Sequence, residues 1–166
     1  MANVTFKGTL MTLVGNEVKV GDTAPDFKVL DNDLNEVRLS DYSGQVRLIS
    51  VVPSVDTGVC AEQTQRFNDA AEKLSNVKVL TVSMDLPFAQ KRWIQANDIQ
   101  HIDIFSDHKD ADFAQQYGVL MEELRLLARS VFVVDSEGKV TYTEYVSEGT
   151  NHPDYEKALA AVKETK

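Results

Sequence analysis

The stretch that most constrains the fold is a short apolar run that leads directly into a predicted helix. Residues 46–52 read Val-Arg-Leu-Ile-Ser-Val-Val, a β-branched composition that predicts a buried strand. Pro53 ends this strand, because proline has no N–H group to donate to a sheet. Asp56 and Thr57 are both suited to cap a helix, and the apolar spacing beyond them predicts one. The single cysteine, Cys60, therefore falls in the first turn of a helix that follows a central strand.

This placement gives Cys60 a defined chemical setting. The first N–H groups of a helix lack partners within it, and the aligned peptide dipoles place partial positive charge there. Both effects favour the thiolate, the nucleophilic form of cysteine. The Thr57 hydroxyl, one turn earlier, can face the sulfur across a gap that fits a small substrate, and Pro53 would shield that gap from water. The alternative is an inert, buried apolar cysteine, the commoner role of a lone one, but the surrounding sequence favours the reactive interpretation.

Along the rest of the chain, apolar periodicity predicts both strands and helices. Residues 3–20 indicate one or two small hairpins, and residues 119–127 fit either helix or loop. Further strands are predicted at 27–30, 36–39, 77–83, 101–105, 130–134 and 139–146, and helices at 87–97, 107–117 and 153–162. A βαβ unit followed by a hairpin and a last helix predicts the α/β class, a central mixed sheet flanked by helices. This is the order of the thioredoxin-like fold with an extra N-terminal hairpin, expected to form one domain, residues 1–166.

Composition and charge exclude several classes of function. The net charge of −9 argues against nucleic acid or an anionic membrane as a partner, since both need clustered Lys and Arg. No run approaches the roughly 18 apolar residues of a membrane span, and no signal peptide is visible, so a cytoplasmic setting is expected. One cysteine excludes an internal disulfide. His101, His108 and His152 lack metal-ligand spacing, and with no haem or flavin pattern we expect no cofactor.

Three motifs in order resemble one family. Pro53, Thr57 and Cys60 match the Pro-x-x-x-Thr-x-x-Cys pattern of the peroxiredoxins. Residues 84–93 and 127–135 are similar to the bacterial thiol peroxidase subfamily, and the likeness covers nearly the whole chain. The resemblance implies a thioredoxin-like fold. It also implies a thiol-dependent peroxidase that reduces hydrogen peroxide and organic (alkyl) hydroperoxides through a sulfenic acid on Cys60.

Such chemistry needs a cation beside the sulfur. A guanidinium suits this task, because it stays charged and donates in a fixed fork. Arg129 directly precedes the predicted strand 130–134, and its position alone leaves a catalytic role and a simple flanking role equally open. The resemblance favours Arg129, since the family carries its catalytic arginine at this place. Arg125 is the rival candidate, and Arg47 and Arg66 are expected to be solvated or ion-paired.

The sequence departs from the family at the residue that would complete a disulfide cycle. Many thiol peroxidases have a resolving cysteine in the helix after the Asp-Leu-Pro-Phe-Ala motif, where this chain has Ile94. We therefore expect a one-cysteine cycle in which an external thiol, from thioredoxin or a small molecule, regenerates Cys60. The family also implies a homodimer.

Three other functions compete with the peroxidase. One is a peroxide sensor that relays oxidation without efficient turnover, and another is a binding module with an inert thiol. A disulfide oxidoreductase is disfavoured, because the pair that would form Cys-x-x-Cys is Thr57 and Cys60.

Overall fold

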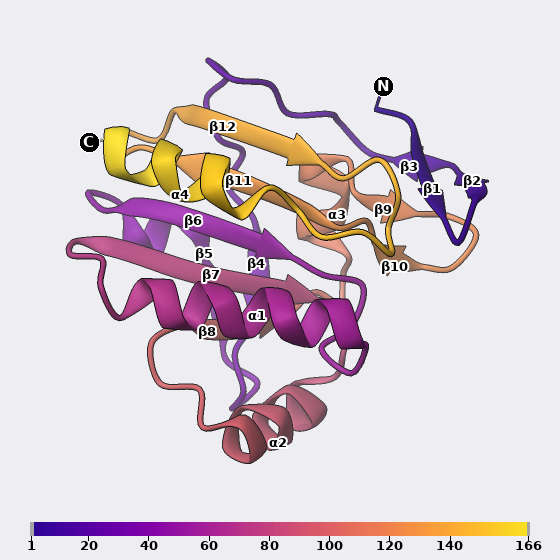
Figure 1. The fold of residues 1–166 in the computed structure, drawn as a ribbon, viewed down its shortest axis with the longest axis horizontal. Coiled ribbons are helices and arrows are strands. Elements are labelled where there is room, and N and C mark those ends of the chain that lie inside the picture. Colours follow the sequence, from indigo (N-terminus) through magenta and orange to yellow (C-terminus); the bar gives the residue numbers. More distant parts are fainter. Residues whose placement is uncertain (1, 166) are drawn as a thin grey trace.

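The computed structural model describes residues 2–165, which build one large sheet and two small ones (Figure 1). The large sheet has the strand order β12-β11-β6-β7-β8-β4-β5. Its strands are β4 (Lys28–Leu30), β5 (Glu36–Arg38), β6 (Val46–Val51), β7 (Val77–Ser83), β8 (Asp103–Ser106), β11 (Ser130–Val134) and β12 (Val140–Tyr145). The three central strands β6, β7 and β8 run parallel, and the outer strands pair antiparallel.

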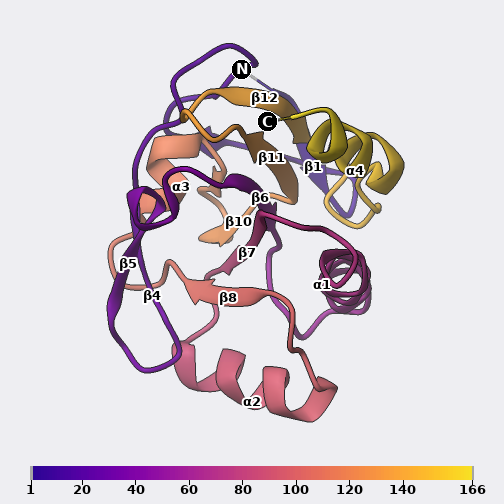
Figure 2. The same cartoon turned by 90° about the vertical axis from the view of Figure 1, so that its left-hand side faces the viewer.

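Helices cover both faces of this sheet. They are α1 (Gly58–Ala71), α2 (Pro87–Asn97), α3 (Asp112–Tyr117) and α4 (Tyr155–Glu164), with a 3₁₀ turn, η1, at Leu39–Tyr42. Seen along the strands, α1 and α4 lie on one side of the sheet and α3 on the other (Figure 2). The predicted mixed sheet flanked by helices is confirmed. Within residues 2–165, no helix combines the length and apolarity needed to cross a membrane.

Strand periodicity divides the core into two layers. In β6, Leu48 packs with the apolar residues beneath α1 and α4, whereas Ile49 packs on the opposite face with Phe113 of α3. Successive strand side chains point to opposite faces, so a strand buried on both sides is expected to be mostly apolar. This explains why residues 46–52 form a largely apolar run.

Arg47 interrupts that run without reaching solvent, so the expectation that it is solvated or ion-paired is wrong. Its side chain is only 3% exposed, because β6 is a central strand. Its guanidinium donates to the carbonyl oxygens of Leu39 and Asp135. Burial lowers the pKa of Arg47 from its ordinary value. Arg66, in contrast, is exposed as expected and lies over the ring of Tyr155 at 4.0 Å.

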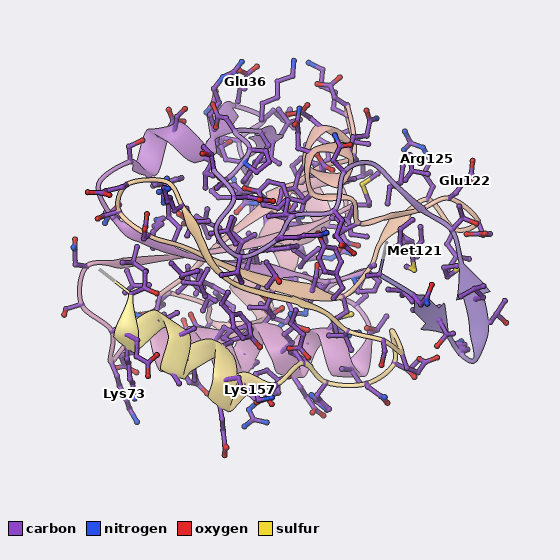
Figure 3. All side chains as sticks on the ribbon, turned by 90° about the horizontal axis from the view of Figure 1, so that it is seen from above. Glu36, Lys73, Met121, Glu122, Arg125 and Lys157 are labelled. Atoms are coloured by element: carbon purple, nitrogen blue, oxygen red, sulfur yellow. The ribbon has the colours of Figure 1, made fainter. Side chains whose placement is uncertain are left out.

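The segment 119–127, which the sequence left undecided, forms a tight hairpin of β9 (Leu120–Met121) and β10 (Leu126–Leu127). Viewed from above, Met121, Glu122 and Arg125 lie together at this end of the molecule (Figure 3). The strand β3 (Leu13–Val14) pairs with β9 and completes a three-stranded sheet.

The extra N-terminal hairpin is confirmed as β1 (Val4–Phe6) paired with β2 (Thr9–Met11). It does not join the large sheet, but docks on the loop that follows β12. The N–H of Thr5 donates to the Ser147 carbonyl at 2.8 Å, and the N–H of Gly149 donates to the Thr5 carbonyl at 2.7 Å. The hairpin and this loop are therefore one local unit.

One predicted helix is shorter than expected. The prediction began it at residue 107, whereas α3 begins at Asp112. Ala111 has a left-handed backbone, with φ of 49°, which cannot lie inside an α-helix. Asp107 instead caps the helix from outside: its carboxylate accepts the N–H groups of Phe113 and Ala114 at 3.0 and 2.9 Å.

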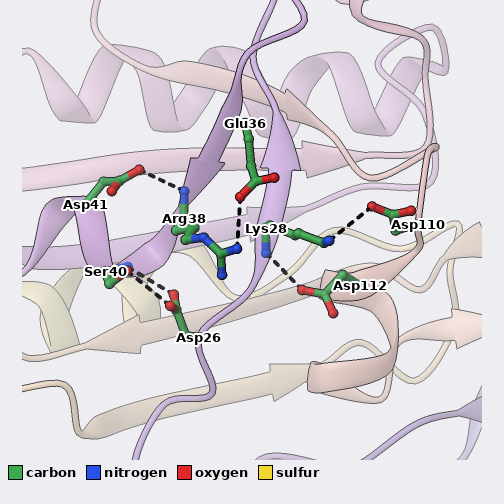
Figure 4. Close-up of polar contacts among 8 residues, drawn as sticks. All are labelled: Asp26, Lys28, Glu36, Arg38, Ser40, Asp41, Asp110 and Asp112. Carbon is green, nitrogen blue, oxygen red and sulfur yellow. Dashed lines mark hydrogen bonds and ion pairs between the residues drawn. The ribbon is translucent and has the colours of Figure 1, made fainter.

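The edge strand β5 and its neighbour β4 carry a dense set of polar contacts (Figure 4). Lys28 pairs with Asp110 at 3.7 Å, and its N–H donates to Asp112, which joins the strand to α3. Arg38 pairs with Glu36 at 2.9 Å along the exposed edge. Charged side chains on an edge strand discourage pairing with another chain.

Candidate active site

Cys60 lies in the first turn of α1, fully buried, near the carboxyl end of the central strand β6. Thr57 is the N-cap of the helix, and its hydroxyl accepts the N–H of Cys60 at 3.4 Å. Pro53, two residues after β6 ends, is also buried. The predicted succession of strand, proline, cap and cysteine is thus present, and it places the sulfur at the positive end of a helix.

Arg129 reaches this cysteine from a distant part of the chain. Its Nη2 donates to the Cys60 Sγ at 3.2 Å, and its side chain is only 2% exposed. Ser130, the first residue of β11, pairs with Val51 at the end of β6. Because β11 runs antiparallel to β6, the residue before it must lie beside the loop that leads to the cysteine. The sheet register therefore brings the two groups together.

The other nitrogens of Arg129 are also held. Nη1 donates to Oε1 of Gln63 at 2.9 Å, and Nε donates to the carbonyl oxygen of Gly149 at 3.0 Å. Gln63 is completely buried, and its Nε2 donates in turn to the Ser50 hydroxyl at 2.8 Å. A guanidinium with each of its nitrogens bonded in this way has one orientation.

Sequence reasoning missed Gln63 as part of the site, although a signal was present. Gln63 lies on the face of the predicted helix that carries Val59 and Phe67, and a glutamine on a buried face must find polar partners. It finds them in Ser50 and Arg129. Gly149 had no signal in the sequence, because its contribution is a backbone carbonyl.

The sulfur lies in a region of positive electrostatic potential. A guanidinium donates to the sulfur where water is excluded, and the helix N-terminus adds to the positive potential. Tyr155 lies in the same apolar cluster as Cys60, and burial raises the pKa of Tyr155 above its ordinary value of 10.0. Tyr155 therefore remains a neutral phenol, and its hydroxyl is bonded to Nδ1 of His152 at 2.8 Å.

A pocket of about 350 Å³ opens over the first turn of α1. Arg129, whose guanidinium donates to the Cys60 sulfur, forms part of its wall. The volume suits a small substrate. Its lining residues are Phe6, Lys7, Pro53, Thr57, Gly58, Val59, Arg129, Gly149 and Thr150.

A second polar group fixes the loop between β6 and α1. The carboxylate of Asp85, just beyond β7, accepts the Ser54 hydroxyl at 2.7 Å and the Val55 N–H at 2.8 Å. It also accepts the Ser83 hydroxyl at 2.7 Å. Since this loop carries Pro53, which lines the pocket, Asp85 holds one part of the pocket wall in position.

The structure thus brings together Pro53, Thr57, Cys60 and Arg129. The rival Arg125 is exposed in the turn between β9 and β10 and does not line the pocket. Within residues 2–165, no group of three or more His, Cys, Asp or Glu side chains could hold a metal ion.

Ile94 lies on α2 and packs, partly buried, against the apolar cluster that contains Cys60. Trp93 is buried in the same cluster.

Comparison with known proteins agrees with this arrangement. The sequence profile of the Redoxin family matches residues 19–159. The thiol peroxidase of Oceanobacillus iheyensis is 64% identical over 160 residues, covering 96% of this chain and 98% of that protein. The thiol peroxidase of Bacillus subtilis is 61% identical over 163 residues, 98% of each chain. The crystal structure of a peroxiredoxin-like protein from Aquifex aeolicus has a TM-score of 0.93 and 43% identity, covering 99% of this chain and 97% of that one.

Proposed function

The chain belongs to the Redoxin family and, within it, to the thiol peroxidases, and from this we propose that it reduces hydroperoxides at the thiolate of Cys60. Hydrogen peroxide and alkyl hydroperoxides are the proposed substrates. The observation that carries the assignment of the site is the 3.2 Å hydrogen bond to Cys60 Sγ from Nη2 of Arg129, a residue that lines the neighbouring pocket.

In the first step the thiolate attacks the nearer peroxide oxygen. A sulfur–oxygen bond forms and the O–O bond breaks, so Cys60 becomes a sulfenic acid and the peroxide is reduced to water or an alcohol. The leaving oxygen takes both electrons of the broken bond and a proton. The Arg129 guanidinium supports this step twice, because it stabilises the thiolate and can donate to the negative charge that develops on the oxygens. The Thr57 hydroxyl, at the pocket wall, is the proposed donor that aligns the substrate.

In the second step an external thiol attacks the sulfenic acid. This forms a mixed disulfide and water, and a second thiol then releases Cys60 and leaves as the oxidised reductant. A protein thiol such as thioredoxin or a small thiol fits this scheme. A cycle without an internal disulfide follows from the single cysteine, with Ile94 at the position where relatives of this kind carry a resolving thiol.

The test is the second-order rate constant for oxidation of Cys60 by hydrogen peroxide and by cumene hydroperoxide. Trp93 shares an apolar cluster with Cys60, so its fluorescence can follow the reaction, and mass spectrometry can identify the sulfenic acid. We expect a rate constant orders of magnitude above that of a free thiol. Arg129→Ala should lower it by about 10²–10³-fold, the usual effect of removing one preorganised donor.

Arg125→Ala is the matched control, since that side chain is exposed and outside the pocket, and it should leave the rate unchanged. A wild-type rate equal to that of a free thiol would refute the peroxidase. A peroxide sensor without turnover is not favoured, because the relatives that match the whole chain are thiol peroxidases. Steady turnover with thioredoxin or a small thiol would separate the enzyme from the sensor.

We also propose a homodimer and a cytoplasmic setting. The dimer rests on the family likeness. The setting is supported by a chain with one reduced, buried cysteine and no disulfide framework.

A further inference from the structure

The N-terminal hairpin supplies part of the pocket wall. Phe6 ends β1 and Lys7 begins the turn that follows, and both line the pocket over Cys60. Both precede residue 19, where the match to the Redoxin profile begins. The hairpin is therefore an addition to the common fold that reaches the reacting centre.

One carboxylate fastens this hairpin to the site. Oε1 of Glu148 accepts the Thr5 hydroxyl at 3.0 Å and the Gly8 N–H at 2.8 Å, both from the hairpin. Oε2 accepts the N–H of Thr150 at 2.6 Å and the Thr150 hydroxyl, both from the loop after β12. These hydrogen bonds, that of the Thr150 hydroxyl first, lower the pKa of Glu148 to about 2. The carboxylate is therefore ionised at neutral pH and holds both segments at once.

Gly149 lies between Glu148 and Thr150 in the chain, and its carbonyl oxygen accepts a hydrogen bond from Arg129 Nε at 3.0 Å. The hairpin packs directly against it, since a Cβ atom at Gly149 would lie 2.6 Å from Cδ2 of the Phe6 ring. The position of that carbonyl thus depends on the hairpin on one side and on Glu148 and Thr150 on the other. Arg129 in turn depends on the carbonyl for its orientation toward Cys60.

We propose that Glu148 is a positioning residue for peroxide reduction, which acts by clamping the N-terminal hairpin onto the Gly149–Thr150 loop and so aiming Arg129 at the sulfur. The proposal rests on the proposed function, because it assigns a role in that same reaction. It makes the hairpin a functional part of the pocket.

The test compares Glu148→Ala with Glu123→Ala. Glu123 is a matched control, because it too is a carboxylate that holds the N-terminal segment: it accepts the N–H and the hydroxyl of Thr12 at 2.8 and 2.7 Å. It contacts no residue of the pocket wall among the hydrogen bonds it makes. Glu148→Ala should slow Cys60 oxidation by hydrogen peroxide about tenfold, a size typical of a misplaced catalytic group. Glu123→Ala should change it less than twofold.

A second measurement separates positioning from general loosening. The absorbance of the thiolate at 240 nm, titrated against pH with Cys60→Ser as the blank, reports how strongly Arg129 supports the charged sulfur. The titration of Glu148→Ala should shift to higher pH, that of Glu123→Ala should coincide with the wild type, and Glu148→Gln, which keeps one acceptor oxygen, should be intermediate.

The outcomes distinguish the two levels of inference. If the wild type reacts fast, and Glu148→Ala and Glu123→Ala do not differ from each other in oxidation rate or in thiolate titration, the role of Glu148 is refuted. The proposed peroxidase activity is then unaffected. A wild-type rate equal to that of a free thiol would overturn both.

Discussion

The geometry at Arg129 depends on side chains that never meet the substrate. Gln63 is the main one, because it accepts from Arg129 Nη1 with one atom and donates to Ser50 with another. Both partners are buried, so the amide has no water to replace either bond. Removing it leaves a buried guanidinium N–H without an acceptor, which typically costs about 1–3 kcal/mol.

We predict that Gln63→Met, which keeps the volume but not the polar atoms, lowers the free energy of unfolding by about 1–3 kcal/mol and slows Cys60 oxidation. The slowing should vanish when Arg129 is already alanine, because Gln63 acts through that arginine. Urea unfolding and peroxide kinetics on the double-mutant cycle measure both effects. Equal slowing in the presence and absence of Arg129 would show that Gln63 acts by another route.

At the scale of elements, the site is formed where the ends of three neighbouring strands lie side by side. The carboxyl ends of β6 and β7 and the amino end of β11 lie at one edge of the sheet, which is where α/β proteins place their ligands. The loop after β6 carries Pro53, and Asp85, two residues beyond the end of β7, holds that loop through Ser54 and Val55.

We predict that Asp85→Ala slows peroxide oxidation of Cys60 about tenfold, because the loop loses the carboxylate that shapes it. Asp135→Ala is the matched control. The carboxylate of Asp135 also holds a loop by accepting hydrogen bonds, from the N–H groups of Glu137 and Lys139, but in a turn at the opposite end of the sheet. The control should lose stability while keeping the rate. If the two variants lose rate equally, the contacts of Asp85 are only structural.

The sequence predicted elements well where the signal was local. The strand–proline–helix stretch is defined by neighbours in the chain, so Pro53, Thr57 and Cys60 could be placed from their spacing alone. The short helix α3 was misplaced at its start, because the chain enters it through a left-handed Ala111 that no periodicity reveals. The β9–β10 hairpin has strands of two residues, too short to show alternation.

Contacts between distant segments were the harder part of the site. Pattern alone could not decide between Arg129 and Arg125, since that choice depends on which strand lies beside β6 and in what register. In the sequence Glu148 resembles an ordinary surface glutamate, and in the structure it is half-buried. Its importance comes from four donors contributed by two segments more than a hundred residues apart.

At the scale of the whole molecule, one buried carboxyl group should make the free energy of unfolding depend on pH. Asp107 is 2% exposed, and burial, reinforced by Asp112 and Asp110, raises its pKa to about 7 although two backbone N–H groups oppose the shift. The unfolded chain releases this proton near the ordinary value of 3.8. Between these two values the folded state holds a proton that the unfolded state has lost. The contribution of Asp107 is therefore full below about pH 4 and is lost as the pH rises through about 7.

We predict that the unfolding free energy of the wild type, minus that of Asp107→Asn, decreases as the pH rises from 5.5 to 8. Urea denaturation at several pH values measures this difference, in which the other titrating groups cancel. A difference independent of pH would mean that Asp107 is ionised in the fold throughout this range.

The long separations within the site also set when it comes into being. Cys60 and Arg129 are 69 positions apart, and Gly8 and Glu148 are 140 apart. On a ribosome, a chain that has emerged as far as residue 120 already contains the thiol and its helix, but none of Arg129, Glu148 and Gly149. The cysteine is thus synthesised before the residues that surround its sulfur, and its site is complete only when they have been added and folded. A chain interrupted before residue 129 lacks the guanidinium, so we expect its Cys60 to react with peroxide as an ordinary thiol does.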